Sequence, residues 1–323
     1  MATWCGDARE LARSEEAANP LETGHLIEMG RFLRHHAAST QQVGIQACHW
    51  LEEGKILYFP VSPFALSADE TDVLLRQRQS NRRWHKNIAY RPLEDRVTGC
   101  DPKHVDAGRL HQVLRSFSRR TVEFAAGLLP AYSCCWRLDY ASFRPLEEKG
   151  RALRLHARND LIHVDSFPRR PTYGDRILRM FMNINPQAER HWITGEPLDV
   201  LAREMGTEFG RQFVRPARPA LWQRLAGVLR LPVRPGSPYD QAMRAMHQSM
   251  KESGPFQQNC RKYYTHFPPG SAWLVFTDAV PHSVVSGQFA LEQTVIVPRG
   301  AMLLPDKAPA SVLERLGCRL RAA

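Results

Sequence analysis

Apolar residues recur at two different spacings along the chain, and the spacing changes near residue 130. Before that point helical spacing prevails, both in the polar stretch 1–50, with its clearest run at 25–36, and in a long segment at about 103–128. In the long segment, Leu110, Val113, Leu114 and Phe117 fall on one face. The first part of the chain is therefore predicted to form helices that each bury one apolar stripe.

Three shorter features interrupt these helices. Residues 56–59 form an apolar run ended by Pro60, which predicts a strand. Ser67, followed three residues later by Glu70, has the pattern of a capping box and predicts the start of a helix. The basic stretch 81–92 is predicted to be a loop.

After Cys134 the apolar residues alternate with a period of two, which is typical of strands. The β-rich runs are bounded by proline and glycine and cover 135–145, 151–165, 175–185, 271–278 and 288–298. This succession favours an α+β protein built on a double-stranded β-helix, a cupin-like jelly-roll barrel flanked by helices. We expect residues 1–130 to pack on a core formed by 131–323 in one integrated domain, with 187–260 as a helical insertion.

The predicted insertion is rich in arginine. Seven lie between residues 203 and 234, namely Arg203, Arg211, Arg215, Arg218, Arg224, Arg230 and Arg234. Within this stretch, residues 219–230 are predicted to form a helix with one apolar side, which includes Trp222, flanked by basic residues. A short basic amphipathic helix of this kind is typical of a membrane interface. A lid helix packed on the barrel is an equal alternative. In either position, clustered guanidinium groups suit bidentate binding of phosphate.

Composition narrows the classes of protein to which the chain can belong. No apolar run approaches the roughly 20 residues that span a bilayer, and the first 20 residues lack the apolar core of a secretory signal, so a cytoplasmic protein is expected. The net charge of +11 favours an anionic partner. No nucleic-acid-binding motif accompanies the charge, so a nucleic-acid partner is not expected. Seven cysteines without a C-x-x-C pair predict reduced, mostly buried thiols.

A candidate metal site comes from the tripeptide His163-Val164-Asp165 and a distant histidine, His282. Side chains two residues apart on an extended segment point the same way, so His163 and Asp165 can bind one ion together. With His282 they would form a two-histidine, one-carboxylate set, which leaves coordination positions open for Fe(II) oxygen chemistry. The same tripeptide at 104–106 is predicted to lie on the long helix, where residues two apart diverge.

This reaction class also requires a cation for the distal carboxylate of a 2-oxo acid. No basic residue follows His282 until Arg299, so the cation is expected elsewhere. On 176–185, Arg179, Phe181 and Asn183 share the face predicted to line the barrel, and Arg144 shares a face with Tyr140 and Ser142. A buried arginine needs an anionic partner, which a bound dicarboxylate or a structural glutamate can supply.

Taken together, these segments resemble the Kdo hydroxylases, Fe(II)/2-oxoglutarate-dependent dioxygenases of Gram-negative bacteria. The similarity lies in LYFPVSPFALS at 57–67, SFRPLEEKGR at 142–151, HVDSFPRRPT at 163–172 and SGQFALEQT at 286–294. It implies hydroxylation at C3 of a 3-deoxy-D-manno-octulosonic acid (Kdo) residue on Kdo2-lipid A. It further implies that the enzyme acts at the cytoplasmic face of the inner membrane, with O2 as oxidant and ascorbate as the reductant in vitro.

The resemblance also implies roles for individual residues. His163, Asp165 and His282 would bind iron, and Arg179 and Arg144 would bind 2-oxoglutarate, with Asn183 and Ser142 on the same faces. Candidates for contact with the sugar are Arg158, Asn159, Asp160, Gln288, Glu292 and Gln293, with surface or structural roles as the alternative for each.

Two other functions remain open at this point. The same iron and cosubstrate could serve a protein or another envelope metabolite, because the site residues would be identical. A basic binding protein for membrane or nucleic acid, with an inactive barrel, would explain the charge without the metal residues. A zinc hydrolase has less support, because the H-E-x-x-H pattern is absent.

Overall fold

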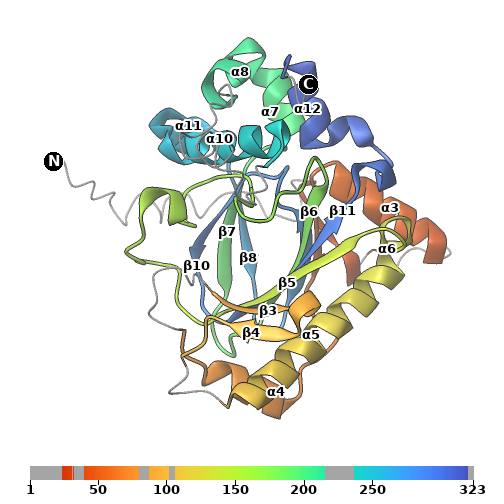
Figure 1. Ribbon diagram of the computed structural model, residues 1–323, viewed down its shortest axis with the longest axis vertical. Coiled ribbons are helices and arrows are strands. Elements are labelled where there is room, and N and C mark those ends of the chain that lie inside the picture. The colour runs from red at the N-terminus through yellow and green to blue at the C-terminus, as the bar shows by residue number, and fades with distance from the viewer. Residues whose placement is uncertain are drawn as a thin grey trace, which may run out of the picture.

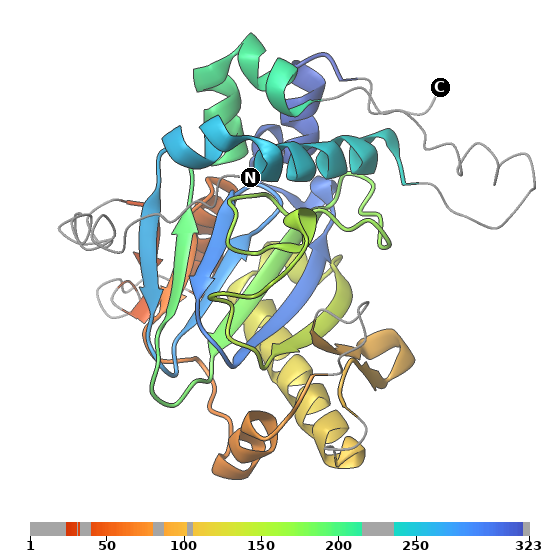
Figure 2. The same ribbon diagram turned by 90° about the vertical axis from the view of Figure 1, so that its left-hand side faces the viewer.

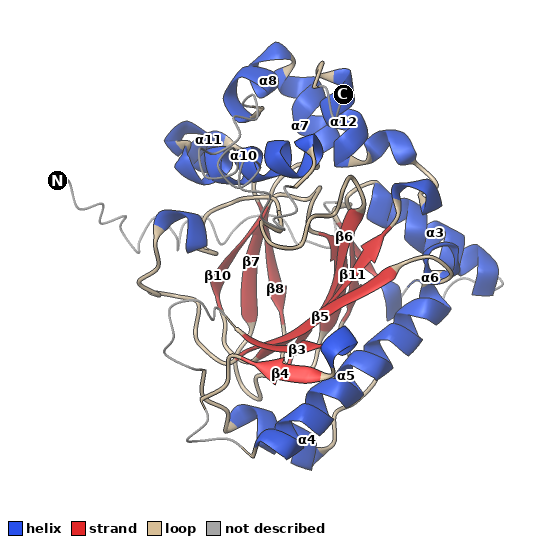
Figure 3. Cartoon of the chain, viewed as in Figure 1, coloured by secondary structure: helices blue, strands red, loops and turns tan. Residues whose placement is uncertain are grey.

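Two β-sheets face each other at the centre of the structure, a computed structural model that describes residues 24–30, 32, 40–79, 87–101, 106–214 and 236–318 (Figure 1; Figure 3). The larger sheet runs in the order β1 (Leu26–Glu28), β2 (Ile56–Phe59), β9 (Ala272–Phe276), β6 (Arg176–Asn183), β11 (Ala290–Val297), β5 (Arg137–Arg144), β3 (Ile88–Arg91) and β4 (Arg96–Thr98). The smaller sheet has the order β10 (His282–Ser286), β7 (Arg190–Thr194) and β8 (Tyr263–Phe267).

The path of the chain between the sheets defines the fold. After β6 the chain crosses to the smaller sheet for β7 and β8, returns for β9, crosses again for β10 and returns for β11. Neighbours among these strands are antiparallel. This alternation is the double-stranded β-helix predicted from the sequence.

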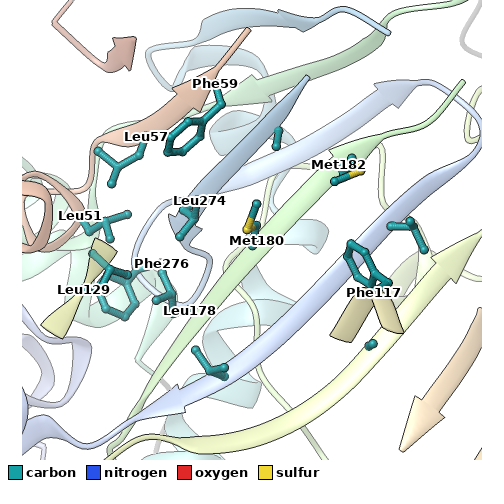
Figure 4. Close-up of a cluster of buried hydrophobic side chains, with 14 of the residues drawn as sticks. Leu51, Leu57, Phe59, Phe117, Leu129, Leu178, Met180, Met182, Leu274 and Phe276 are labelled. Atoms are coloured by element: carbon teal, nitrogen blue, oxygen red, sulfur yellow. The ribbon is translucent and has the colours of Figure 1, made fainter. Parts of the chain in front are cut away.

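One face of the larger sheet is covered by α3 (Thr40–Glu52), α5 (Ala107–Leu128) and α6 (Pro130–Ser133) (Figure 1). Leu178, Met180 and Met182 of β6 point into this core, as their alternation with Arg179 and Phe181 predicts (Figure 4). Burying a side chain of this size contributes about 1.5–3 kcal/mol. The apolar residues of β6 thereby hold the strand so that Arg179 faces the space between the sheets.

A second group of helices covers one end of the sheets (Figure 1; Figure 2). It comprises α7 (Leu198–Met205), α8 (Thr207–Phe213), α10 (Pro238–Glu252), α11 (Gly254–Asn259) and α12 (Pro309–Arg315). Their apolar side chains pack together with Ile162 and Val164, which flank His163. Within the described ranges, no helix combines the length and apolarity that crossing a bilayer requires.

The structure corrects several boundaries. Leu26–Glu28 is a strand paired with β2, and not helical, while β3 lies inside the stretch predicted as a basic loop. The helical insertion begins at Leu198, not 187, because Arg190–Thr194 forms β7. The segment 151–165 contains no named strand and has the 3-10 turn η2 (Leu155–Ala157).

The capping box of α4 (Ala68–Leu75) is confirmed, because Ser67 Oγ accepts from Glu70 N and Glu70 accepts from Ser67 N. The helix predicted from about 103 begins instead at Ala107, because the Asp106 side chain caps it by accepting from Arg109 N. Asp106 thus precedes the helix, and His104 lies outside the described residues.

Two other predictions concern the cysteines and the arginine-rich stretch. The six described cysteines are free, but Cys134 and Cys135 are exposed and Cys48 alone among the six is buried. The predicted basic amphipathic helix 219–230 lies outside the described residues, as do five of the seven arginines between residues 203 and 234. The other two, Arg203 and Arg211, are exposed and lie within 4 Å of Asp199 and Glu208, respectively.

Candidate active site

A cavity of about 630 Å³ lies between the two sheets and beneath α10. Strands of both sheets line it, and α10 contributes Arg244, His247 and Gln248. Six arginines line the cavity, against two carboxylates, Asp165 and Glu292. Its volume is typical of a small-molecule site, and its charge favours an acidic ligand.

Three residues predicted as metal ligands converge in this cavity. Atoms of His163, Asp165 and His282 that could bind a metal all lie within 4.8 Å of one another. The Nε2 atoms of His163 and His282 are 4.0 and 3.8 Å from Asp165 carboxylate oxygens, and all three side chains are almost fully buried. The structure therefore brings together residues that are separated by up to 119 positions in the sequence.

Backbone carbonyl groups orient both imidazoles. His163 Nδ1 lies 2.6 Å from Leu161 O, and His282 Nδ1 lies 2.9 Å from Val280 O. A carbonyl only accepts, so each Nδ1 carries the hydrogen and each Nε2 presents its lone pair to the cavity. Burial, followed by the charge of Lys251, lowers the pKa of His163 well below its usual value, and burial also lowers the pKa of His282. Both rings are thus neutral, as metal ligands must be.

The carboxylate of Asp165 is kept ionised. Burial alone would raise its pKa, but Arg179 and the two imidazoles outweigh that effect and hold the pKa far below its usual range. Arg179 Nη1 lies 3.0 Å from Asp165 Oδ2, yet this buried oxygen accepts no well-aligned hydrogen bond. An anionic oxygen without a full set of partners suits a cation between the two imidazoles.

Arg144, the second arginine predicted to bind 2-oxoglutarate, lines the cavity but is already paired. Its Nη2 and Nε lie 2.5 and 3.1 Å from Glu292 Oε2, and its Nη1 lies 3.8 Å from Glu148 Oε1. The alternative of a structural arginine–glutamate pair therefore describes Arg144. Glu292 is shared, since Arg179 Nη1 is 3.5 Å from its other oxygen.

A buried arginine of the cavity whose charge is only partly compensated was missed from the sequence. Arg190 on β7 is 1% exposed and lines the cavity, and its Nη1 donates to Gly287 O at 2.9 Å. Its nearest carboxylate oxygen, on Glu148, is 3.9 Å away, and its Nε has no partner. Burial and the neighbouring charge of Arg144 lower the pKa of Arg190 to about 10. Arg190 is the first residue of a strand of only five residues, and the sequence around it has no pattern that would mark this arginine as a cavity residue.

The remaining predicted residues divide into two groups. Ser142, Asn159 and Glu292 line the cavity. The others lie away from its lining: Asn183 binds the carbonyls of Ala188 and Phe267, Arg158 pairs with Asp160, Gln288 donates to Pro145 O, and Gln293 donates to Asp139 O. Gln293 alternates with Glu292 and Thr294, so its side chain points to the opposite face of β11. Asn183, Arg158, Asp160, Gln288 and Gln293 thus lie outside the lining of this cavity, and their contact with a ligand stays a prediction.

A second cluster of two histidines and one carboxylate lies on β7 and β8. Glu189 Oε2 is 3.4 Å from His191 Nε2 and 3.3 Å from His266 Nδ1, and all three side chains are exposed. The two rings stack with centroids 4.3 Å apart. Cross-strand pairing of His191 with His266 places them side by side. We call this the outer cluster, and His163, Asp165 and His282 the inner cluster.

Comparison with known proteins gives consistent results. A family model described as 3-deoxy-D-manno-oct-2-ulosonic acid (Kdo) hydroxylase matches residues 34–319. The apo structure of the Kdo hydroxylase KdoO, a non-haem Fe(II) α-ketoglutarate-dependent dioxygenase, is 34% identical, with a TM-score of 0.77, over 88% of this chain and 93% of that chain. Its complex with α-ketoglutarate and Fe(III) gives a TM-score of 0.75 at 34% identity, with the same coverage. The cobalt(II) complex gives 0.76 at 34% identity, over 89% and 94% of the two chains. A search of curated proteins finds no match.

Proposed function

The chain belongs to the Kdo hydroxylase family, and from that membership we propose that it hydroxylates C3 of Kdo in Kdo2-lipid A, using Fe(II), 2-oxoglutarate and O2. The observation that carries the proposal is the inner cluster, in which two oriented imidazoles and one ionised carboxylate meet in a buried cavity rich in arginine. The similar KdoO structures are those of an Fe(II)- and α-ketoglutarate-dependent dioxygenase, with α-ketoglutarate, succinate, iron or cobalt bound.

His163, Asp165 and His282 are the proposed iron ligands. Their free Nε2 lone pairs and the incompletely bonded Asp165 Oδ2 provide three donors, which leaves room for further ligands on the ion. Bound Fe(II) would activate O2, the oxidant, so that one oxygen atom replaces a C–H bond by C–OH while the other oxidises 2-oxoglutarate to succinate and CO2. The protein's own part is to keep both imidazoles neutral, hold the carboxylate ionised and exclude bulk water.

Arg179 is the proposed partner for the distal carboxylate of 2-oxoglutarate, with Arg144 beside it. Arg179 Nη1 lies 3.0 Å from Asp165 and 3.5 Å from Glu292, and with Asp165 engaged as a metal ligand its guanidinium would be available to a further anion. Arg144 fixes Glu292 and Glu148 and so shapes the wall behind Arg179. Ser142 lies on the same strand and lines the same wall.

Arg244 and Asn159 are proposed for the substrate side of the cavity. Arg244 is exposed on α10 and lines the cavity, and no carboxylate lies within salt-bridge distance of it in the described ranges. It can therefore bind an acidic group of the sugar without breaking an internal pair. Kdo2-lipid A carries carboxylates and phosphates, which also match the net charge of +11.

Membrane association follows from the same substrate, which is embedded in lipid. We propose that the protein works as a peripheral enzyme at the cytoplasmic face of the inner membrane. A Lys or Arg near an anionic membrane surface contributes about 1 kcal/mol to binding. Co-sedimentation with anionic, but not zwitterionic, vesicles is the expected result, and equal recovery with both would remove this part of the proposal.

A direct assay tests the activity. Purified protein with Fe(II), ascorbate, 2-oxoglutarate and Kdo2-lipid A should add oxygen to a Kdo residue, with one succinate and one CO2 formed for each oxygen atom added. Mass spectrometry detects the oxygen, NMR assigns it to C3, and His282→Ala is the inactive control. Consumption of 2-oxoglutarate with an envelope extract, but no oxygen on Kdo2-lipid A, would identify a different substrate for the same machinery.

A further inference from the structure

The segment that carries two of the three proposed iron ligands is supported by few β-sheet hydrogen bonds. We call residues 159–165 the ligand segment. It lies along β10, with Val284 N donating to Asn159 O at 2.8 Å and with His163 and His282 exchanging both backbone hydrogen bonds at 3.0 and 2.9 Å. Asp165 N donates to Thr277 O at 2.8 Å. This pairing is too sparse to form a strand.

The geometry of antiparallel pairing shows which backbone groups remain to be satisfied. Where both the N–H and C=O of His163 face β10, those of Ile162 and Val164 face the other way. In a wider sheet another strand would bind these groups. Here α10 and α11 of the helical insertion lie on that side.

Gln257 on α11 takes the place of the absent strand at Ile162. Its Oε1 accepts from Ile162 N at 2.9 Å, and its Nε2 donates to Ile162 O at 2.8 Å. One carboxamide thus makes the two hydrogen bonds that a neighbouring peptide would make. The same Nε2 lies 2.8 Å from Met250 O, which ties the pair to the end of α10.

His247 on α10 makes the next contact along the segment. Its Nδ1 lies 2.8 Å from Val164 O, the carbonyl between the two ligands, and must donate because a carbonyl only accepts. The ring of His247 meets that of His163 edge-on, with centroids 4.8 Å apart. His247 therefore restrains the backbone between the two ligands, at Val164, and the ring of the ligand His163.

The same helix holds both flanks of the ligand segment. Lys251, one turn after His247, is 3% exposed and donates through Nζ to Arg158 O at 2.6 Å and to His156 O at 3.1 Å. Near the start of α10, Asp240 Oδ1 accepts from Thr172 N at 2.8 Å and Tyr173 N at 3.3 Å. The backbone from 156 to 173 is thus attached to α10 and α11 at successive points.

We propose that α10 and α11 act as the missing strand of the smaller sheet, and that Gln257 and His247 are positioning residues for the metal ligands. Ordering His163 and Asp165 before the ion arrives removes part of the entropy cost of binding it. The proposal rests on the proposed function only in taking the inner cluster as a metal site. Loss of partners that orient metal ligands typically weakens metal binding by about 10- to 100-fold.

Cobalt(II) binding to the metal-free protein provides the test, because it needs neither substrate nor turnover. Gln257→Met keeps the shape of the side chain and removes both hydrogen bonds, so its affinity should fall by about 10- to 100-fold. Gln212→Met is the matched control, because Gln212 binds Ser253 in the same helical group and leaves the ligand segment alone. Its affinity should equal that of the wild type.

A second pair of variants keeps the test valid if Gln257→Met does not fold. His247→Leu should weaken cobalt binding by a similar factor, whereas His247→Asn, whose amide can still donate to Val164 O, should recover most of the affinity. Amide hydrogen exchange at 162–165 in the metal-free protein should increase in Gln257→Met and His247→Leu, but not in Gln212→Met.

The outcomes separate this inference from the proposed function. Unchanged cobalt affinity in both Gln257→Met and His247→Leu, with only the melting temperature lowered, would show that the two helices stabilise the fold without positioning the metal ligands. That result would overturn the inference. Wild-type protein that binds cobalt tightly, with the expected losses in the variants, but adds no oxygen to Kdo2-lipid A would overturn the substrate assignment and leave the positioning roles in place.

Discussion

The inner and outer clusters contain the same three donor types, two histidines and one carboxylate, in very different surroundings. The inner side chains are 6–12% exposed, and the outer ones 40–52%. Each inner imidazole gives its Nδ1 hydrogen to a carbonyl, so its Nε2 is oriented before any ligand binds. In the outer cluster the two rings stack nearly parallel, at 21°, and both turn toward Glu189.

The contrast shows that donor type and proximity alone do not make a catalytic metal site. Lone pairs of imidazole lie in the ring plane, so two stacked rings direct them side by side and not at one point. Water also competes for exposed donors, and it does so much less for the buried side chains of the inner cluster. We therefore propose that the inner cluster binds the metal and that the outer one is a cross-strand pair stabilised by Glu189.

Removing the carboxylates should produce the largest difference between the clusters. Asp165→Ala is expected to lower turnover by more than about 10³-fold, because a bound metal ion lowers the activation barrier by several kcal/mol and this variant would lose it. Glu189→Ala should leave turnover unchanged. Succinate release with Kdo2-lipid A measures the effect, and circular dichroism should show native folding, since Arg179 retains Glu292 as a partner. An active Asp165→Ala protein would end the assignment of this residue as a ligand.

Metal stoichiometry tests the comparison directly. Titration of the metal-free protein with cobalt(II) should give one tight site per chain. His163→Ala and His282→Ala should abolish that site, whereas His191→Ala and His266→Ala should keep it. A second tight site that disappears in His266→Ala would show that exposure and ring stacking do not prevent the outer cluster from binding metal.

The inner cluster also has arginines beside its carboxylate, and two of them should behave differently. Arg179→Ala is expected to raise the KM for 2-oxoglutarate by about 10- to 100-fold, the equivalent of one or two charge-assisted hydrogen bonds. Arg144→Ala should instead destabilise the fold, by up to about 3–5 kcal/mol, because buried Glu292 loses the guanidinium at 2.5 Å and keeps only Arg179 at 3.5 Å. Urea unfolding and KM together separate the two, and a changed KM with unchanged stability in Arg144→Ala would reverse their roles.

Short-range patterns in the sequence account for the part of this site that could be predicted. Residues two apart on an extended segment share a side, which places His163 with Asp165. Long alternating runs give β5, β6 and β11, and a continuous apolar run gives β9. The alternation in β6 also placed Arg179 in the cavity. These predictions need only local geometry, because side-chain direction repeats with the period of the backbone.

The missed features depend on contacts between distant residues. Arg144 and Glu292 are 148 positions apart, so nothing local indicated that this arginine was already paired. Gln257 meets Ile162 across 95 positions, and a glutamine on a short helix has no distinctive pattern. The strands β3, β4, β7, β8 and β10 have three to five residues each, too few to establish a period.

The smallest expected difference between the clusters concerns pH and the metal-free protein. Burial lowers the pKa of His163, His282 and the adjacent His247, the last to about 4. Since the unfolded chain binds protons first, at its ordinary pKa near 6.5, folding stability is complete above that pH and falls as the pH drops toward the folded values. For His247, whose pKa in the folded protein is about 4, the loss of stability should be about 0.8 kcal/mol at pH 6, and His163 and His282 should add to it in the same direction.

Urea midpoints between pH 7.5 and 5 measure this loss. His247→Asn, which removes one titrating ring and keeps a donor for Val164 O, should flatten the dependence, whereas His266→Ala should leave it as in the wild type. A wild-type midpoint that stays constant down to pH 5 would mean that the inner imidazoles accept protons as readily in the folded as in the unfolded protein. Their neutrality would then have to come from the metal and not from the fold, and the inner cluster would lose one of the properties that distinguish it from the outer one.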